Sequence, residues 1–259
     1  KNKVMLILGD NFFYGQGLEK TIQDAIKSKK NFIFAYKVKD PKNYGVVRFN
    51  KFGKILKINE KPKKFISNYA IPGIYIYDNQ VSEYAKLLKK SKRGELEITD
   101  AIQWLIDNGH VVDHDILDGW WIDTGKKDPL LECNRLVLSK ADSEIAQSAV
   151  IDEETSISGV VQIGEKSVIS NSIIEGPVAI GNGVTISDSH IRPFTSIGDG
   201  VRVSDSTLED SVLLEGCVID RAGLITASLV GSNSKVSGST VSTDSNTLLL
   251  GDNSIIDLS

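Results

Sequence analysis

Two patterns of hydrophobic and polar positions divide the chain. Up to about residue 140, short apolar runs alternate with amphipathic segments, whereas from about residue 145 aliphatic residues recur every five or six positions. Short apolar runs predict buried strands and amphipathic segments predict helices, so the first part is expected to be an α/β domain. Strands are predicted at 4–8, 32–38, 45–49, 55–59 and 73–78, and helices at 18–28, 81–91 and 99–109. We therefore predict two domains, 1–140 and 145–259.

Single residues mark several ends of these elements. Thr99 is expected to cap the N-terminus of the third helix, and Gly109 to stop it. The sequence NKFG at 50–53 is typical of a hairpin turn. Pro62 is expected to hold the preceding Glu60 and Lys61 in an extended segment, because a proline disfavours the helical region for the residue before it.

The aliphatic positions of the second part follow a regular step of five or six residues. Ile163 to Ile180 and Ile180 to Ile197 are each 17 residues, and the surrounding strings IGEKSV, IGNGVT and IGDGVR repeat as well. The positions are Ile151, Ile157, Ile163, Ile169, Ile174, Ile180, Ile186, Ile191, Ile197, Val203, Leu208, Leu213, Ile219, Ile225, Val230, Val236 and Val241. Self-similarity of this kind indicates a stacked solenoid.

A step of about six residues lets three flat faces form one triangular coil, with the aliphatic residues stacked inside. The pattern resembles the left-handed parallel β-helix of hexapeptide repeats, over residues 151–241. A β-sandwich with irregularly spaced strands is the alternative. Each coil buries its core only against its neighbours, so several coils are needed for stability.

Composition and charge exclude several classes of protein. Among the 259 residues, 30 Lys and Arg stand against 34 Asp and Glu, giving a formal charge of -4. A chain without a basic stripe is not expected to bind nucleic acid or an anionic membrane. No apolar run has the length of a membrane span, and from the N-terminal pattern we expect no export signal. With only two cysteines, Cys133 and Cys217, we expect a cytoplasmic protein without a disulfide framework.

Carboxylates follow apolar runs at two distant places. Asp10 and Asp123 can meet at the carboxyl edge of an α/β sheet, where such sheets bind ligands. Paired carboxylates suit Mg²⁺, which fills its other positions with water and phosphate. Each aspartate could instead cap a turn. Glu60 beside Lys61 suits a ligand that carries hydroxyls and a phosphate; the alternative is a solvated surface pair. Gly45 has no side chain and would let a ligand approach the backbone.

A set of longer strings favours the ligand-binding interpretation of these residues over turn caps and surface pairs. LGDNFFYGQG, YGVV, EKPKK, SNYAIPGIYIYD, RGELEITD and GWWIDTG occur in this order. The chain thereby resembles sugar nucleotidyltransferases, most of all long-form glucose-1-phosphate thymidylyltransferases with a C-terminal β-helix. The resemblance covers nearly the whole chain and extends to TLLLGDNSIIDL, so the C-terminus is expected to be complete. It implies a partial Rossmann-like nucleotidyltransferase domain before the β-helix.

The resemblance also implies roles for single residues. Asp10 and Asp123 match the two Mg²⁺-binding carboxylates, and with Lys61 they are the expected catalytic residues. The positions matched to the sugar 1-phosphate site are Leu8, Tyr44, Gly45, Glu60, Lys61, Ile71 and Trp121. Glu60 would accept sugar hydroxyls, Lys61 would hold the phosphate, and Leu8 and Trp121 would wall the pocket. The implied partners are a sugar 1-phosphate and a nucleoside triphosphate, with dTTP favoured and UTP as the alternative.

One part of the family pattern does not occur in this sequence. The family begins with a glycine-rich loop and further elements that bind the nucleotide and supply a catalytic Arg or Lys, and the string LGDN follows about a hundred residues later. Here LGDN begins at Leu8, and GDNFFYGQG does not match that loop. We therefore expect that these 259 residues alone do not turn over nucleotide.

The solenoid has two expected uses. One is structural, because its coils are expected to hold a homo-oligomer. The other is acyl transfer with a histidine as general base, for which His190 is the only candidate within the repeats. His190 precedes the core residue Ile191, so its side chain is expected to point outward, and the stack is expected to offer no second polar cluster. A non-catalytic assembly subunit is the third alternative, and Cys217 is expected to be a small apolar filler.

Overall fold

The computed structural model describes residues 3–15, 17–28, 30–238 and 245–258. The chain divides into two compact units, residues 1–123 and 124–259, which we call unit 1 and unit 2. The predicted boundary at 140–145 falls after helix α4 (Lys127–Leu138), which lies in unit 2. No helix in the described ranges has the length and apolar character needed to cross a membrane.

Unit 1 contains the predicted strands and helices close to their expected ranges, together with strands at 11–14, 69–70, 112–116 and 120–123 that were not predicted. Its strands are β1 (Lys3–Ile7), β2 (Asn11–Tyr14), β3 (Asn31–Lys37), β4 (Gly45–Phe49), β5 (Ile55–Glu60), β6 (Tyr69–Ala70), β7 (Ile74–Asp78), β8 (Val112–Ile116) and β9 (Trp120–Asp123). Its helices are α1 (Leu18–Lys27), the short 3₁₀ helix η1 (Pro41–Asn43), α2 (Val81–Lys86) and α3 (Ile98–Asp107).

Two helix predictions were wrong in detail. Helix α2 ends at Lys86 rather than at residue 91, because the chain tightens there: the N–H groups of Leu87 and Leu88 donate to carbonyls only three residues earlier, at 3.0 and 3.3 Å. Helix α3 begins at Ile98, so Thr99 lies inside the first turn and does not cap it. Gly109 confirms the predicted stop, since its φ of 78° is the left-handed conformation that ends a helix.

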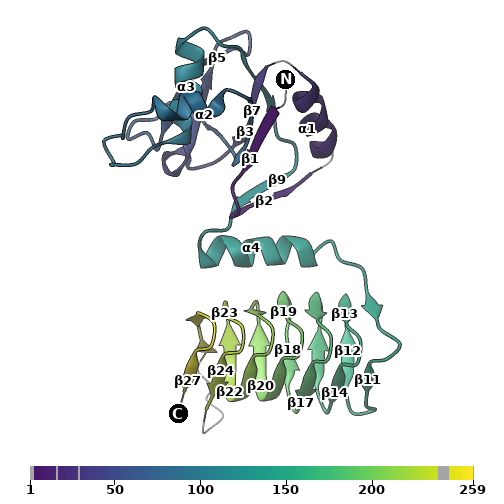
Figure 1. Ribbon diagram of the computed structural model, residues 1–259. Coiled ribbons are helices and arrows are strands. Elements are labelled where there is room, and N and C mark those ends of the chain that lie inside the picture. The colour runs from purple at the N-terminus through teal and green to yellow at the C-terminus, as the bar shows by residue number, and fades with distance from the viewer. Residues whose placement is uncertain (1–2, 16, 29, 239–244, 259) are drawn as a thin grey trace. The chain divides into compact units, whose positions relative to one another are not determined.

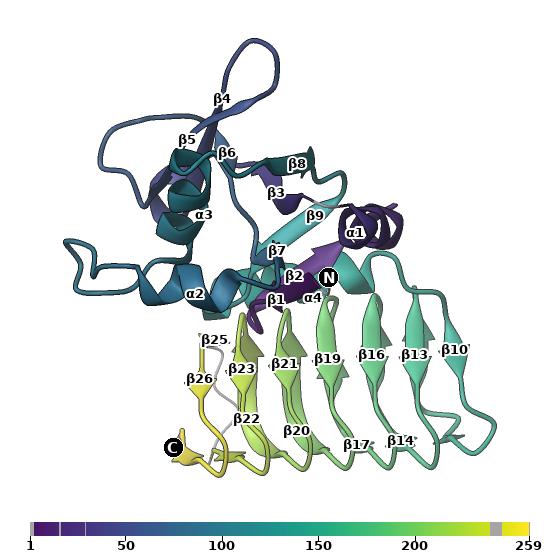
Figure 2. The same ribbon diagram turned by 45° about the horizontal axis from the view of Figure 1, so that its top comes forward.

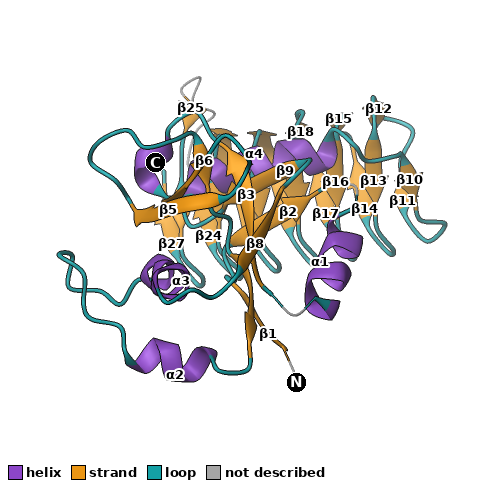
Figure 3. Ribbon diagram, turned by 90° about the horizontal axis from the view of Figure 1, so that it is seen from above, coloured by secondary structure: helices purple, strands orange, loops and turns teal. Residues whose placement is uncertain are grey.

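The sheet of unit 1 has the order β1-β7-β3-β6-β4-β5, with β8 beside β3. The β3–β8 pairing is parallel and the other pairings of these strands are antiparallel. Tyr84 of α2 and Ile102 of α3 pack in a core on one face, and Ala25 of α1 packs in a second core on the other face (Figure 3). Helices on both faces confirm the predicted α/β architecture.

Strand β1 was predicted to be buried, and this was wrong. It lies at the edge of the described sheet and pairs only with β7 within the described ranges. Its apolar side chains from Val4 to Ile7 are between 38% and 49% exposed. An exposed apolar edge strand is a template for pairing with another strand.

Unit 2 is a stack of short parallel strands, with helix α4 beside it (Figure 1). One face holds the seven strands labelled along the row in Figure 2: β10 (Glu144–Ile145), β13 (Val161–Ile163), β16 (Val178–Ile180), β19 (Thr195–Ile197), β21 (Val212–Leu213), β23 (Leu229–Val230) and β26 (Leu249–Leu250). The others are β11 (Val150–Ile151), β12 (Ser156–Ser158), β14 (Val168–Ser170), β15 (Ile173–Glu175), β17 (Thr185–Ser187), β18 (His190–Ile191), β20 (Arg202–Glu209), β22 (Val218–Thr226), β24 (Lys235–Ser237), β25 (Ser245–Asn246) and β27 (Ile255–Asp257).

The register confirms the predicted 17-residue repeat. Ile163 pairs with Ile180, and Ile180 pairs with Ile197. The repeat positions from Ile163 to Val236 are buried in one continuous core, where Cys217 is also fully buried as a filler. Val241 lies outside the described residues. The parallel-strand solenoid is therefore established, and its left-handed sense stays a prediction.

Helix α4 packs on the seven-stranded face. The amide of Asn134 donates to the carbonyl of Phe194 at 2.8 Å and accepts from the hydroxyl of Ser196 at 2.6 Å. Arg135 forms a two-point ion pair with Asp210, with Nε 2.6 Å from Oδ1. The helix thus covers the middle of this face.

Buried serines tie successive coils together at one corner. The hydroxyl of Ser189 accepts the backbone N–H of Ser206 at 3.3 Å and donates to the carbonyl of Ser187 at 2.7 Å. Ser172 makes the same contacts one coil earlier, accepting the N–H of Ser189 at 3.1 Å. Each hydroxyl therefore satisfies a buried backbone donor that the turning chain leaves unpaired.

Candidate functional site

The two predicted metal carboxylates are brought together by a ribbon. Strand β2 pairs with β9 so that Asn11 lies opposite Asp123. Asp10 directly precedes Asn11, and its Oδ1 accepts the Asn11 amide N–H at 2.8 Å. We expected both aspartates at the carboxyl edge of the α/β sheet. Asp123 instead lies at the end of the separate β2–β9 ribbon, because β9 pairs with β2 and not with the main sheet.

Asn11 makes several hydrogen bonds that hold the site together, and it was not identified from the sequence. Its side-chain oxygen accepts the indole N–H of Trp121 at 2.6 Å and the backbone N–H of Gly73 at 3.0 Å. The backbone N–H of Leu8 in turn donates to the carbonyl of Gly73 at 2.9 Å. A Cβ atom on Gly73 would lie 2.8 Å from both Leu8 and Asn11, so only glycine fits here. Leu8, Asp10 and Trp121 are thus fixed around one amide group.

Gly45 and Glu60 form the second part of the site. They are paired across strands β4 and β5. The hydroxyl of Thr99 donates to Oε2 of Glu60 at 3.0 Å. A Cβ on Gly45 would lie 2.5 Å from the Thr99 methyl carbon and 3.0 Å from Oε2 of Glu60. The missing side chain of Gly45 therefore leaves room for the carboxylate, and Ile71 is held beside it by an N–H to the Gly45 carbonyl at 2.8 Å.

The electrostatics at Glu60 depend on burial and on its neighbours. Burial raises the pKa of Glu60 above its ordinary value, and the hydrogen bond from Thr99 offsets part of the effect. Nη1 of Arg93 lies 3.7 Å from Glu60 and 3.4 Å from the buried Glu97. Arg93 was not singled out from the sequence, and Thr99 was singled out only as a helix cap. Both lie in RGELEITD, one of the strings that carry the family resemblance, and that string was the signal that could have found them.

Tyr44 joins the two parts of the site. Its ring centre lies 5.1 Å from that of Trp121, with the planes at 61°. Its carbonyl accepts the N–H of Lys61 at 3.0 Å. Of the two residues predicted to be extended before Pro62, Glu60 is confirmed as the last residue of strand β5, whereas Lys61 has a φ of 37°, so the prediction was wrong for Lys61. The hydrogen bond to Tyr44 ends the β4–β5 ladder, and there the chain turns out of the strand in a conformation that is strained for lysine.

The arrangement fits a divalent metal that is completed by a ligand. Within the described ranges, no group of three or more His, Cys, Asp or Glu side chains lies close enough to hold a metal ion alone. Mg²⁺ commonly binds through one or two carboxylates and takes its other oxygens from water and substrate phosphates. Asp10 and Asp123 stay the predicted carboxylates for such an ion, and the ribbon places Asn11, the neighbour of Asp10 in the chain, opposite Asp123.

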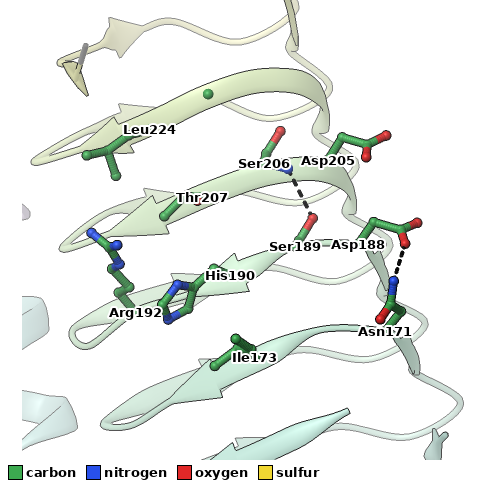
Figure 4. A pocket seen from close by; sticks show the side chains of 11 residues that line it. Asn171, Ile173, Asp188, Ser189, His190, Arg192, Asp205, Ser206, Thr207 and Leu224 are labelled. Carbon is green, nitrogen blue, oxygen red and sulfur yellow. Dashed lines mark hydrogen bonds between the residues drawn. The ribbon is translucent and has the colours of Figure 1, made fainter. Parts of the chain in front are cut away.

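The solenoid carries a polar cluster that we did not expect. His190 and Glu175 lie on one outward face, with Nε2 of His190 2.8 Å from Oε2 of Glu175. Arg192, on the same coil as His190, lies 3.4 Å from Glu209 on the next coil. His190 and Arg192 line a hollow of about 580 Å³, together with Ile173, Thr207 and Leu224 (Figure 4). The outward direction of His190 is confirmed, and it has a carboxylate partner.

Comparison with known proteins places the chain in a family. The family model described as "Nucleotidyl transferase" matches residues 1–140. A glucose-1-phosphate thymidylyltransferase from Streptomyces antibioticus is 37% identical over 256 residues, which cover 98% of this chain and 71% of the relative. The enzyme of the same name from Streptomyces griseus is 34% identical, over 96% of this chain and 70% of the relative.

A third relative matches about half of the chain at a higher identity. It is a glucose-1-phosphate thymidylyltransferase from Mycobacterium tuberculosis, 46% identical over 132 residues, which cover 51% of this chain and 46% of the relative. The Streptomyces relatives extend the similarity over the solenoid as well. On these similarities and on the site described above, the chain belongs to the nucleotidyl transferase family.

Proposed function

We propose that unit 1 binds a hexose 1-phosphate and Mg²⁺, and that the protein transfers a nucleotidyl group to this sugar phosphate. The observation that carries the proposal is the ring contact of Tyr44 with Trp121, which links the Gly45–Glu60–Thr99 group to the Asn11–Trp121 pair beside Asp10. The relatives named as glucose-1-phosphate thymidylyltransferases support glucose 1-phosphate as the sugar and dTTP as the nucleotide, with UTP as the alternative.

The side chains supply complementary contacts for such a substrate. Glu60, fixed by Thr99, would accept hydrogen bonds from sugar hydroxyls, and the bare backbone of Gly45 would let the ring approach. Leu8, Tyr44, Ile71 and Trp121 would wall the pocket with apolar surface. Lys61 would hold the phosphate, and its left-handed backbone turns it out of strand β5 toward that task.

The reaction needs no covalent intermediate on the protein. An oxygen of the sugar phosphate attacks the α-phosphorus of the nucleoside triphosphate, a new P–O bond forms, and the bond to pyrophosphate breaks. Asp10 and Asp123 would hold Mg²⁺, which neutralises phosphate charge when bound. Lys61 would add positive charge at the sugar phosphate, so positioning and charge neutralisation would provide most of the acceleration.

Binding of glucose 1-phosphate to the full chain tests the proposal without requiring turnover. Calorimetric titration with Mg²⁺ present should show binding that Glu60→Gln weakens about tenfold, as expected for a lost hydrogen bond to a charged group. Asp123→Asn should remove the Mg²⁺ dependence. Lys57→Glu, on the exposed side of the same strand as Glu60, serves as a control. No binding by the folded wild type would reject the assignment.

We further propose that the solenoid joins copies of the chain. Within the described ranges, helix α4 covers the middle of one solenoid face, and the face around His190 has exposed apolar side chains such as Ile173. Sedimentation of the purified chain tests this proposal, and a monomer at micromolar concentration would reject it.

One observation favours a second activity. The His190–Glu175 pair in its hollow would suit a general base for acyl transfer to an amine or hydroxyl from an acyl thioester. Acetyl-CoA-dependent acetylation of an amino sugar phosphate, lost in His190→Ala, would establish it. Nucleotidyl transfer remains the preferred function because the relatives carry that name.

A further inference from the structure

A cavity of about 610 Å³ lies in unit 1, away from the residues of the candidate site. It is formed by the hairpin turn between β4 and β5, the C-terminal end of α3 and the beginning of β8. Its apolar lining includes Ile55, Ile106 and Val112, and Phe52 also lines it. A volume of several hundred Å³ suits a small organic ligand. None of the predicted site residues takes part in this lining.

Flat ring surfaces contribute to the lining of the cavity. The ring of Phe52 is 82% exposed, and such exposure of a large aromatic residue marks a candidate contact surface. The imidazole of His114 stacks on Phe49, with ring centres 4.4 Å apart and planes at 24°. Burial lowers the pKa of His114 below its ordinary value and so favours the uncharged ring. These surfaces favour a planar aromatic ligand.

The charges around the hairpin turn are positive. Nζ of Lys51 lies 5.0 Å from the centre of the Phe52 ring, and Lys54 lines the cavity. Neither lysine has an ion-pair partner in the part of the chain that the structure describes. The carboxylate of Asp113, by contrast, is paired with Lys30 at 2.7 Å. An anionic group on the ligand would therefore complement the two lysines.

We propose that this cavity is a second ligand site, which takes a small planar aromatic carboxylate. The aromatic ring lies against Phe52 and His114, and the carboxylate is held by the ammonium group of Lys54. The existence of this site does not depend on the function proposed for the other one.

Two elements connect the cavity with Glu60. Strand β5 begins at Ile55, in the cavity lining, and ends at Glu60. Helix α3 carries Thr99, which holds Glu60, in its first turn and Ile106, which lines the cavity, near its end. Gln103 joins the two elements by accepting the N–H of Ile58 at 2.7 Å. Occupation of the cavity is therefore expected to change the affinity for the sugar phosphate, and this second step rests on the proposed function.

Indole-3-carboxylate is a suitable probe for the full chain, measured by saturation-transfer NMR and calorimetry. Binding is expected to the wild type and to be weakened at least about tenfold by Lys54→Glu or Phe52→Ser, which change exposed groups. The neutral indole-3-carboxamide should bind more weakly. Two matched controls, Phe65→Ser at another exposed ring and Lys57→Glu at another exposed lysine, should leave binding unchanged.

The outcomes separate the two claims. Absence of binding, or equal weakening by the controls, overturns the second site. An unchanged affinity for glucose 1-phosphate at saturating indole-3-carboxylate overturns the coupling, whereas a changed affinity must be matched by the same factor in the reverse titration. If glucose 1-phosphate fails to bind even without the probe, the proposed function is rejected and the cavity result stands.

Discussion

Replacing Asn11 by aspartate tests whether this residue organises the two carboxylates of the candidate metal site. The substitution keeps the one side-chain oxygen that accepts the N–H groups of both Gly73 and Trp121. It replaces the amide nitrogen, which donates to Oδ1 of Asp10 at 2.8 Å, with a carboxylate oxygen. The ribbon therefore retains its hydrogen bonds to the sheet, while a third negative charge enters beside Asp10 and Asp123.

The size of the effect follows from the distance. Two unit charges about 3 Å apart repel each other by about 1.5 kcal/mol in water-like surroundings, which apply because Asp10 is exposed. The lost hydrogen bond to a charged acceptor is worth about 1.5 kcal/mol or more. Because these two contributions overlap, we expect the free energy of unfolding to fall by about 2 kcal/mol without divalent metal.

Urea unfolding with and without Mg²⁺ measures the loss of stability without metal and its recovery when Mg²⁺ binds. An additional carboxylate should strengthen cation binding, so Mg²⁺ should stabilise Asn11→Asp more than the wild type and close most of the gap. Asn11→Ser, which adds no charge, should lose stability without any gain in response to Mg²⁺. If Asn11→Asp is as stable as the wild type in chelator, or if Mg²⁺ stabilises both proteins equally, Asn11 does not organise a metal site.

Three further predictions follow from other contacts. Burial raises the pKa of Glu60, so the affinity of the protein for glucose 1-phosphate should fall at a higher pH, as the pH decreases, than it would with an exposed glutamate. Thr99→Val should move this fall to still higher pH, because the hydrogen bond that lowers the pKa of Glu60 is lost. A calorimetric titration repeated over a pH series measures both effects. The contribution of Glu60 to stability has the opposite sign, being full below the ordinary glutamate pKa and lost as pH rises through the raised pKa. Arg135→Ala should cost about 0.5–1 kcal/mol and speed amide hydrogen exchange in α4, because a two-point ion pair with the solenoid is lost. Ser189→Ala should cost about 1–3 kcal/mol in urea unfolding, because the N–H of Ser206 is left buried without an acceptor, and an unchanged midpoint would refute that role.

The sequence predicted the solenoid well because its core repeats at a fixed step. A 17-residue spacing of aliphatic residues specifies which side chains lie inside, and from Ile163 to Val236 the structure buries those positions. Helix α4 was not predicted, because only Leu131 and Leu138 are buried in it and its stability depends on contacts with the solenoid. Tertiary contacts of that kind leave little trace in the local pattern.

The candidate site shows the same limit. The strings around Asp10, Glu60 and Asp123 indicated the site, and the structure brings their residues into two adjoining groups. The roles of Asn11 and Thr99 were missed, since each depends on a side-chain contact with a residue distant in sequence. Local rules assigned Thr99 to a helix cap, whereas its hydroxyl is directed to a carboxylate on a neighbouring strand.

Helix α4 and the solenoid on which it packs have slightly different repeat distances along their length. An α-helix advances about 5.4 Å per turn, and stacked strands advance about 4.8 Å per coil. Lys127 and Asn134, seven residues apart, contact the coils of Ala227 and Ser196, which are two coils apart. The rise per helix turn and the rise per coil differ by about 0.6 Å, so the helix and the stack would be half a coil out of phase after about four turns. This mismatch limits the length over which the turns of a helix can stay in phase with successive coils, and the twelve residues of α4 stay within that limit.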